Sequence, residues 1–134
     1  MTLNADEKKT LSDIRMQKAL EFLDDAKINL DNKRYRTSVN RSYYAALNAL
    51  RSLLILDGAN PESHDGVVTM ISLRFIKTGV LPVDIVKNFK ILLSRRTDVD
   101  YGDFDNINED DAKESYTIAS SIIETVNYTR QKLV

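Results

Sequence analysis

The sequence contains no cysteine and only one histidine, His64, among its 134 residues. The absence of cysteine excludes disulfides, thiolate nucleophiles and cysteine-ligated zinc. A single histidine removes most histidine-based metal sites, including the paired Glu-x-x-His motifs of di-iron helical bundles. We therefore expect no metal and no other cofactor. Any chemistry in this chain must rely on side chains other than cysteine.

Glycine and proline are scarce, with four and two residues, and no low-complexity run suggests a long disordered linker. The most apolar stretch is interrupted by Arg51 and falls short of the about 20 apolar residues that a membrane span needs. The polar segment 1–13 has no apolar signal core. These absences predict a cytoplasmic protein without membrane contact, and the length suits one domain over residues 1–134.

The net charge is −1 at pH 7, so there is no general attraction to nucleic acid, and contact with RNA would need a local basic cluster. One such group is Lys33, Arg34 and Arg36 around Tyr35, in the segment 31–36, which begins with turn-forming residues. Two interpretations stay open for it: a solvated loop with an aromatic anchor, or a small patch that contacts phosphate.

Residues 38–57 form the segment around which the chain is organised. Alanine and leucine dominate it and no glycine or proline interrupts it, which predicts a helix buried on most of its circumference. Gly58 is expected to end this helix in a left-handed cap. Its polar residues stand out against that background: Asn40, Arg41, Asn48 and Arg51.

Four further segments show helical spacing of apolar residues. The first, about 5–30, has an expected buried stripe of Leu11, Ile14, Ala19, Leu20, Leu23, Ala26 and Leu30. The others are expected to begin at Pro61, at Pro82 and after Asn108, which can cap the last helix above an acidic first turn. The pattern predicts an all-α, single-domain antiparallel bundle of about five helices.

Arg96 is the most informative anomaly. It continues the apolar stripe of Phe89, Leu92 and Leu93 in the fourth helix. A guanidinium in such a place must be paired, exposed at a cleft, or at a subunit interface. Asp100 lies four residues further on, so a weak surface ion pair is the simple alternative.

Three sequence blocks resemble the HEPN domains, a family of small helical proteins common in prokaryotes. They are N-R-S-Y-Y-A-A at 40–46, S-H-D-G-V at 63–67 and R-T-D-V-D-Y-G-D-F at 96–104. The blocks resemble a branch of small prokaryotic HEPN proteins in order and spacing, over nearly the whole chain. The resemblance implies a helical bundle that dimerises.

In the active ribonucleases of that family, an R-x(4–6)-H motif from each subunit meets its twin across the dimer cleft. The resemblance implies RNA cleavage without a metal, by attack of a 2′-hydroxyl on the adjacent phosphate. Here Tyr101 stands five residues after Arg96, where that histidine is expected. A phenol, with a pKa of about 10, is a poor base at neutral pH, although Tyr101 could donate a hydrogen bond to phosphate or stack on a base.

The candidate catalytic residues are therefore Arg96, Tyr101 and His64. His64 has two interpretations, a packing imidazole at the start of the third helix or a substitute for the missing histidine. The candidate residues for binding nucleotide or RNA are Arg41, Asn40, Tyr44, Arg95 and Arg96.

Arg41, Tyr43 and a cluster of aspartates also need an interpretation. Arg41 either pairs with an acidic residue inside the bundle or faces the cleft. Tyr43 belongs to the expected core, with Leu47 and Leu50. Four aspartates lie close together in the sequence: Asp98, Asp100, Asp103 and Asp105. They lack the spacing of a calcium-binding loop, which favours a solvated helix end.

Two functions of different classes follow. The first is a homodimer that binds nucleotide or RNA phosphate at an arginine-containing cleft between subunits, with toxin-type endoribonuclease activity as its catalytic form. The second is a non-catalytic interaction module that partners a separate minimal nucleotidyltransferase in a toxin–antitoxin pair.

Overall fold

The computed structural model describes residues 2–102 and 106–133, and these residues form five α-helices and no strand. The helices are α1 (Ala5–Asp31), α2 (Tyr35–Leu56), α3 (His64–Ile71), α4 (Asp84–Tyr101) and α5 (Glu109–Leu133). A π-helical turn, Ser72–Ile76, directly follows α3. The predicted all-α fold of five helices is confirmed.

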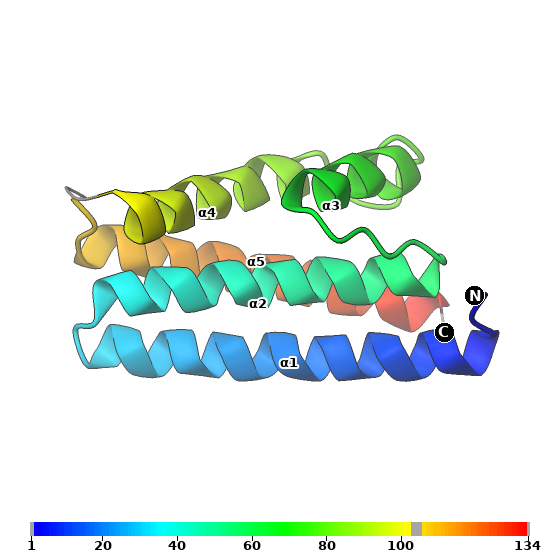
Figure 1. Cartoon of the computed structure of the whole chain (residues 1–134), viewed down its shortest axis with the longest axis horizontal. Coiled ribbons are helices and arrows are strands. Elements are labelled where there is room, and N and C mark those ends of the chain that lie inside the picture. Colours follow the sequence, from blue (N-terminus) through cyan, green and yellow to red (C-terminus); the bar gives the residue numbers. More distant parts are fainter. Residues whose placement is uncertain (1, 103–105, 134) are drawn as a thin grey trace.

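The second helix is the centre of the molecule. It packs against α1, α3, α4 and α5, and Figure 1 shows α1 along one side of it and α3 and α4 along the other. Large side chains along α2 are fully buried, including Tyr43, Leu50, Leu53 and Leu54. The expected burial of this helix and of Tyr43 is therefore confirmed.

The buried stripe of α1 differs from the expected one. Ile14 and Leu20 are exposed, whereas Ser12 and Met16 are buried beside Ala19 and Ala26. Small side chains on this face let α1 approach α2 closely, and the serine hydroxyl is satisfied there because Ser12 Oγ donates a hydrogen bond to the Ser52 carbonyl oxygen at 2.6 Å. Close helix packing, rather than side-chain size, thus determines which face is buried.

The loop between α1 and α2 is shorter than expected. The helix begins at Tyr35 rather than Ser38, so Tyr35 and Arg36 are helical, and their interpretation as loop residues is wrong. Lys33 adopts a left-handed conformation with φ of 62°, which turns the chain within three residues. Lys33 and Arg34 are both exposed.

The later helices α3 and α4 start after the residues expected from the sequence, and a side chain caps α3 but not α4. Ser63 caps α3, accepting a hydrogen bond from the Gly66 backbone N–H at 2.9 Å, so α3 starts at His64 and not at Pro61. Likewise α4 starts at Asp84, two residues after Pro82. The expected cap of α5 is confirmed, because Asn108 Oδ1 accepts from the Asp111 N–H at 2.9 Å.

Gly58 has a φ of 82°, directly after the C-terminal residue that caps α2. The predicted left-handed glycine at this helix end is therefore confirmed. Within the described residues, no helix is long and apolar enough to cross a membrane.

Candidate functional site

Arg96 lies on α4 among three tyrosine rings. Its guanidinium carbon is 5.5 Å from the ring centres of both Tyr43 and Tyr44 and 5.9 Å from that of Tyr101. Only 14% of its side chain is exposed. A cation over aromatic faces is stabilised by the ring quadrupoles, which helps to hold the charge in this mostly buried position.

Two polar contacts fix the orientation of that guanidinium. Nη2 donates a hydrogen bond to Tyr44 Oη at 2.9 Å, and Nε lies 2.8 Å from Asp100 Oδ2. The ion pair with Asp100 considered in the sequence analysis therefore exists. Burial disfavours the charge, but Tyr44, Asp100 and Tyr101 together raise the pKa of Arg96 above its ordinary value. Within the described residues Nη1 makes no hydrogen bond, which leaves its N–H groups as donors without an acceptor.

Tyr43 joins this arrangement to the core. Its ring stacks on Phe89 of α4 at 5.4 Å and meets the ring of Tyr44 edge-on at 5.1 Å. Burial raises the pKa of Tyr43 well above its ordinary value, so its phenol stays protonated. Tyr43 is thus a rigid, neutral wall on one side of Arg96.

His64, the first residue of α3, contacts Tyr43. Its Nδ1 and Tyr43 Oη are hydrogen-bonded, and the two rings meet edge-on at 5.4 Å between centres. Burial, and then the positive charge of Arg96, lower the pKa of His64 below 6.5. The imidazole is consequently neutral at pH 7, and it packs against Tyr43 near enough to Arg96 for the charge of the guanidinium to affect it.

We call these six residues the Arg96 cluster: Tyr43, Tyr44, His64, Arg96, Asp100 and Tyr101. Tyr101 is its most accessible member, with 75% of the residue exposed at the end of α4. The cluster brings together parts of all three sequence blocks. Phe104, Asp103 and Asp105, which also belong to the sequence-based argument, lie outside the described residues.

The structure does not bring Arg95 to this cluster. Its guanidinium faces α5, where Nη2 lies 2.6 Å from Glu114 Oε1 and Nη1 donates to Ser115 Oγ at 3.1 Å. Arg95 therefore joins α4 to α5. Adjacent residues of a helix point about 100° apart, so Arg95 and Arg96 serve different faces.

Arg41 packs against the first helix. Its guanidinium carbon lies 5.5 Å from the ring centre of Phe22 on α1, and Phe22 in turn lies 6.0 Å from Tyr44. Arg41 is thus one aromatic ring removed from the cluster. Asn40 is half-buried at the preceding position of α2.

A groove that sequence reasoning missed opens beside the cluster, between α1 and α2. It has a volume of about 420 Å³ and is lined by Lys18, Glu21, Phe22, Asp25, Tyr44, Leu47, Asn48 and Arg51. The signal was present in the sequence, since Asn48 and Arg51 interrupt an otherwise apolar helix. What the sequence could not show was that α1 leaves this side of them open.

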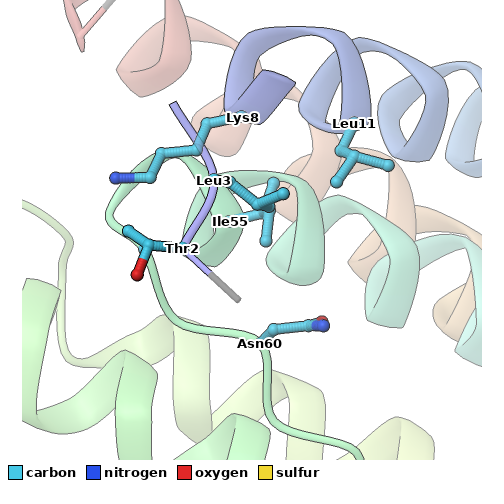
Figure 2. Close-up of a pocket in the computed structure, with 7 residues that line it drawn as sticks. Thr2, Leu3, Lys8, Leu11, Ile55 and Asn60 are labelled. Carbon is cyan, nitrogen blue, oxygen red and sulfur yellow. The ribbon is translucent and has the colours of Figure 1, made fainter. Parts of the chain in front are cut away.

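A second cavity, of about 410 Å³, lies where α1 begins and α2 ends (Figure 2). Figure 2 shows Leu3, Leu11 and Ile55 close together in its wall, with Lys8 extended along one edge. None of its lining residues belongs to the Arg96 cluster. In the described part of the chain, no three histidine, aspartate or glutamate side chains are grouped so as to hold a metal ion.

The fold is that of a small protein whose described residues form a bundle of five α-helices. The HEPN domain model matches residues 12–130, and the chain belongs to this family. It is 30% identical over 120 residues to the "UPF0332 protein" of Thermotoga maritima, covering 90% of this chain and 91% of that protein.

Two further proteins extend the comparison. Over 63 residues the chain is 41% identical to "Putative toxin MJ0605" of Methanocaldococcus jannaschii, covering 47% of each. The crystal structure of TT1696 from Thermus thermophilus superimposes with a TM-score of 0.77 at 19% identity, over 88% of this chain and 97% of that one. This last likeness concerns the fold alone.

Proposed function

We propose that this HEPN protein acts as a homodimer that binds a phosphate of single-stranded RNA at Arg96 and cleaves the strand without a metal. One observation carries the proposal. A guanidinium is enclosed by tyrosine rings on an otherwise apolar helix stripe, and it retains Nη1 for an external acceptor. Arginine suits phosphate because its fork of N–H groups matches two phosphate oxygens.

His64 supplies the base in this proposal. It accepts the proton of the 2′-hydroxyl, whose oxygen attacks the adjacent phosphorus, while the bond from phosphorus to the 5′ oxygen breaks. The leaving 5′ oxygen takes a proton from Tyr101 or from water, and the products are a 2′,3′-cyclic phosphate and a 5′-hydroxyl. Arg96 stabilises the charge that develops on the phosphate oxygens.

This role of His64 requires one particular tautomer. Nδ1 must carry the proton and donate it to Tyr43 Oη, so that Nε2 keeps its lone pair for the substrate. In the other neutral tautomer Tyr43 donates to Nδ1, and Nε2 cannot accept a proton. The lowered pKa of His64 favours the neutral imidazole in either case.

Cleavage of a synthetic RNA in the presence of a chelator tests the proposal. Wild type is expected to cut the strand, and Arg96→Ala and His64→Ala are expected to lower the rate by at least about a hundredfold, as for removal of a charge-stabilising or base group. Arg74→Ala is the matched control, because Arg74 pairs with Asp57 on the surface. A wild-type protein that neither binds nor cuts RNA would contradict the proposal.

A second candidate is the non-catalytic module that partners a separate minimal nucleotidyltransferase. The observation that favours it is the highly exposed Tyr101 in the position of the family's motif histidine. The relative named "Putative toxin MJ0605" agrees with either candidate. A nucleotidyltransferase reading frame beside this one, and co-purification of the two chains without any RNA cleavage, would select the second candidate.

A further inference from the structure

The groove between α1 and α2 contains an arginine with no partner. Arg51 makes no hydrogen bond or ion pair through its side chain within the described residues, and its Nε is buried without an acceptor. A buried N–H of a charged group that lacks an acceptor is unfavourable. Because no side-chain partner of Arg51 is found among the described residues, an anion in the groove would be the counter-charge of its guanidinium.

A second arginine, Arg15, lies beside Arg51, while the charges on the facing helix are mixed, with Lys18 next to Glu21 and Asp25. Arg15 Nη1 donates to the Arg51 carbonyl oxygen at 3.3 Å and Nη2 donates to Asn60 Oδ1 at 2.9 Å. Burial, and then the charge of Arg51, lower the pKa of Arg15. The positive charge of Arg15 therefore adds to that of Arg51 on the α2 side of the groove, which favours an anion at Arg51.

Tyr44 is shared by the groove and the Arg96 cluster. Its ring lines the groove, while its hydroxyl accepts the hydrogen bond from Arg96. Tyr44 and Arg51 are seven residues apart on one helix, which is about 10 Å along its axis. The floor between them consists of Leu47 and Asn48, with Phe22 on the facing helix.

We propose that the groove holds one unstacked nucleotide of single-stranded RNA, with its base over Phe22, Tyr44 and Asn48 and its flanking phosphate on Arg51. This inference rests on the proposed function, since the preceding phosphate of the same strand lies at Arg96. Aromatic rings beside cations are the usual means of holding single strands.

The remaining groups of the groove fit this occupant. Asn48 Nδ2 donates to the Tyr44 carbonyl oxygen at 2.8 Å, which holds its amide in place and leaves Oδ1 for a base edge. Lys18, Glu21 and Asp25 form a mixed rim on α1, in which the carboxylates can accept from the amino groups of a base. Binding of the phosphate is therefore assigned to Arg51 on α2 and not to the mixed charges on α1.

The experiment measures fluorescence anisotropy of the full chain with a labelled, 2′-O-methylated RNA of about eight nucleotides, which cannot be cleaved. Arg51→Gln is expected to bind about tenfold more weakly, and its salt dependence is expected to be shallower by about 0.7 in the log–log slope, the value for one phosphate of a single strand. Lys87→Gln, an exposed lysine outside the groove, is the control with the same charge change.

A second variant tests the base without changing charge. Asn48→Leu removes the amide that would contact the base edge and is expected to weaken binding about tenfold, with an unchanged salt slope. An RNA duplex is expected to bind Arg51→Gln and wild type equally, because it offers no unstacked base. Circular dichroism verifies that each variant is folded.

The outcomes separate the two proposals. If Arg96→Gln loses affinity while Arg51→Gln and Asn48→Leu bind like wild type, the groove is not a nucleotide site and the proposed function stands. If wild type binds no RNA, both proposals fail. Weaker duplex binding by Arg51→Gln would also overturn the inference, since it would show a general charge effect.

Discussion

At the scale of single residues, His64 offers the sharpest measurement, because it is the sole histidine of the chain. NMR titration should give a pKa below 6.5, owing to burial and then to the nearby charge of Arg96. Arg96→Gln removes that charge, so the pKa of His64 should rise toward 6.5. Lys90→Gln, on an exposed position of α4, is the control. A wild-type pKa at or above 6.5 would contradict this account.

The same shift has a consequence for stability. When the folded pKa lies below the unfolded value of about 6.5, the unfolded chain binds more protons between the two values. The contribution of His64 is therefore complete above pH 6.5 and is lost as the pH falls from there through its folded pKa. The melting temperature should fall in this window, and it should fall less in His64→Gln.

At the scale of secondary-structure elements, Gly66 explains the S-H-x-G-V block. A Cβ at Gly66 would lie 2.9 Å from Ser63 Oγ and 3.0 Å from Pro61 Cβ, so it would displace the serine that caps α3. Gly66→Ala is expected to lower the free energy of unfolding by about 1 kcal/mol through loss of the cap, although alanine is normally the better helix former.

Thr69→Ala is the matched comparison for Gly66→Ala, because Thr69 is exposed in the same helix. It should leave stability unchanged or raise it slightly. Urea unfolding measures both variants, and the pKa of His64 reports whether the start of α3 has moved. Equal stability of Gly66→Ala and wild type would show that Ser63 can keep its cap beside an added methyl group.

These elements show how far the sequence predicts the structure. Helix identity followed from apolar spacing, and Arg96 was found because it interrupts such a spacing. Helix starts and buried faces were harder to predict from the sequence. Ser63 determines one start through a hydrogen bond, and Ser12 is buried by close packing of two helices. The positions of Arg95 and Arg41 depend on α5 and on Phe22, which no local pattern reveals.

At the scale of the whole molecule, the side chain of Arg130 on α5 forms hydrogen bonds with α1. Its guanidinium is almost fully buried, donating to Ser12 Oγ at 3.2 Å and to Asp13 Oδ1 at 3.0 Å and 3.1 Å. Arg130→Met should lower the free energy of unfolding by about 2 kcal/mol, the scale of hydrogen bonds to charged groups. Lys132→Met, at an exposed position of the same turn, should change it little. If urea unfolding gave the same loss for both, the network would not hold the helices together.

We also predict that the protein forms a homodimer. The reason is the exposed surface of the Arg96 cluster. Tyr101 is 75% exposed beside a guanidinium that is mostly enclosed, so a second copy of this surface would cover the tyrosine and bring two Arg96 side chains to one cleft. Light scattering at micromolar concentration should then give about twice the chain mass of 15.3 kDa.

Tyr101→Arg tests which surface forms that dimer. It adds a cation next to Arg96 in each subunit, and like charges brought together at an interface oppose association, so the dimer should dissociate at least about tenfold more readily. Tyr128→Arg is the matched control, since Tyr128 is 61% exposed on α5. A wild-type mass of one chain would exclude the dimer. A dimer weakened by Tyr128→Arg and not by Tyr101→Arg would place the contact on α5 and contradict a dimer formed through the Arg96 cluster.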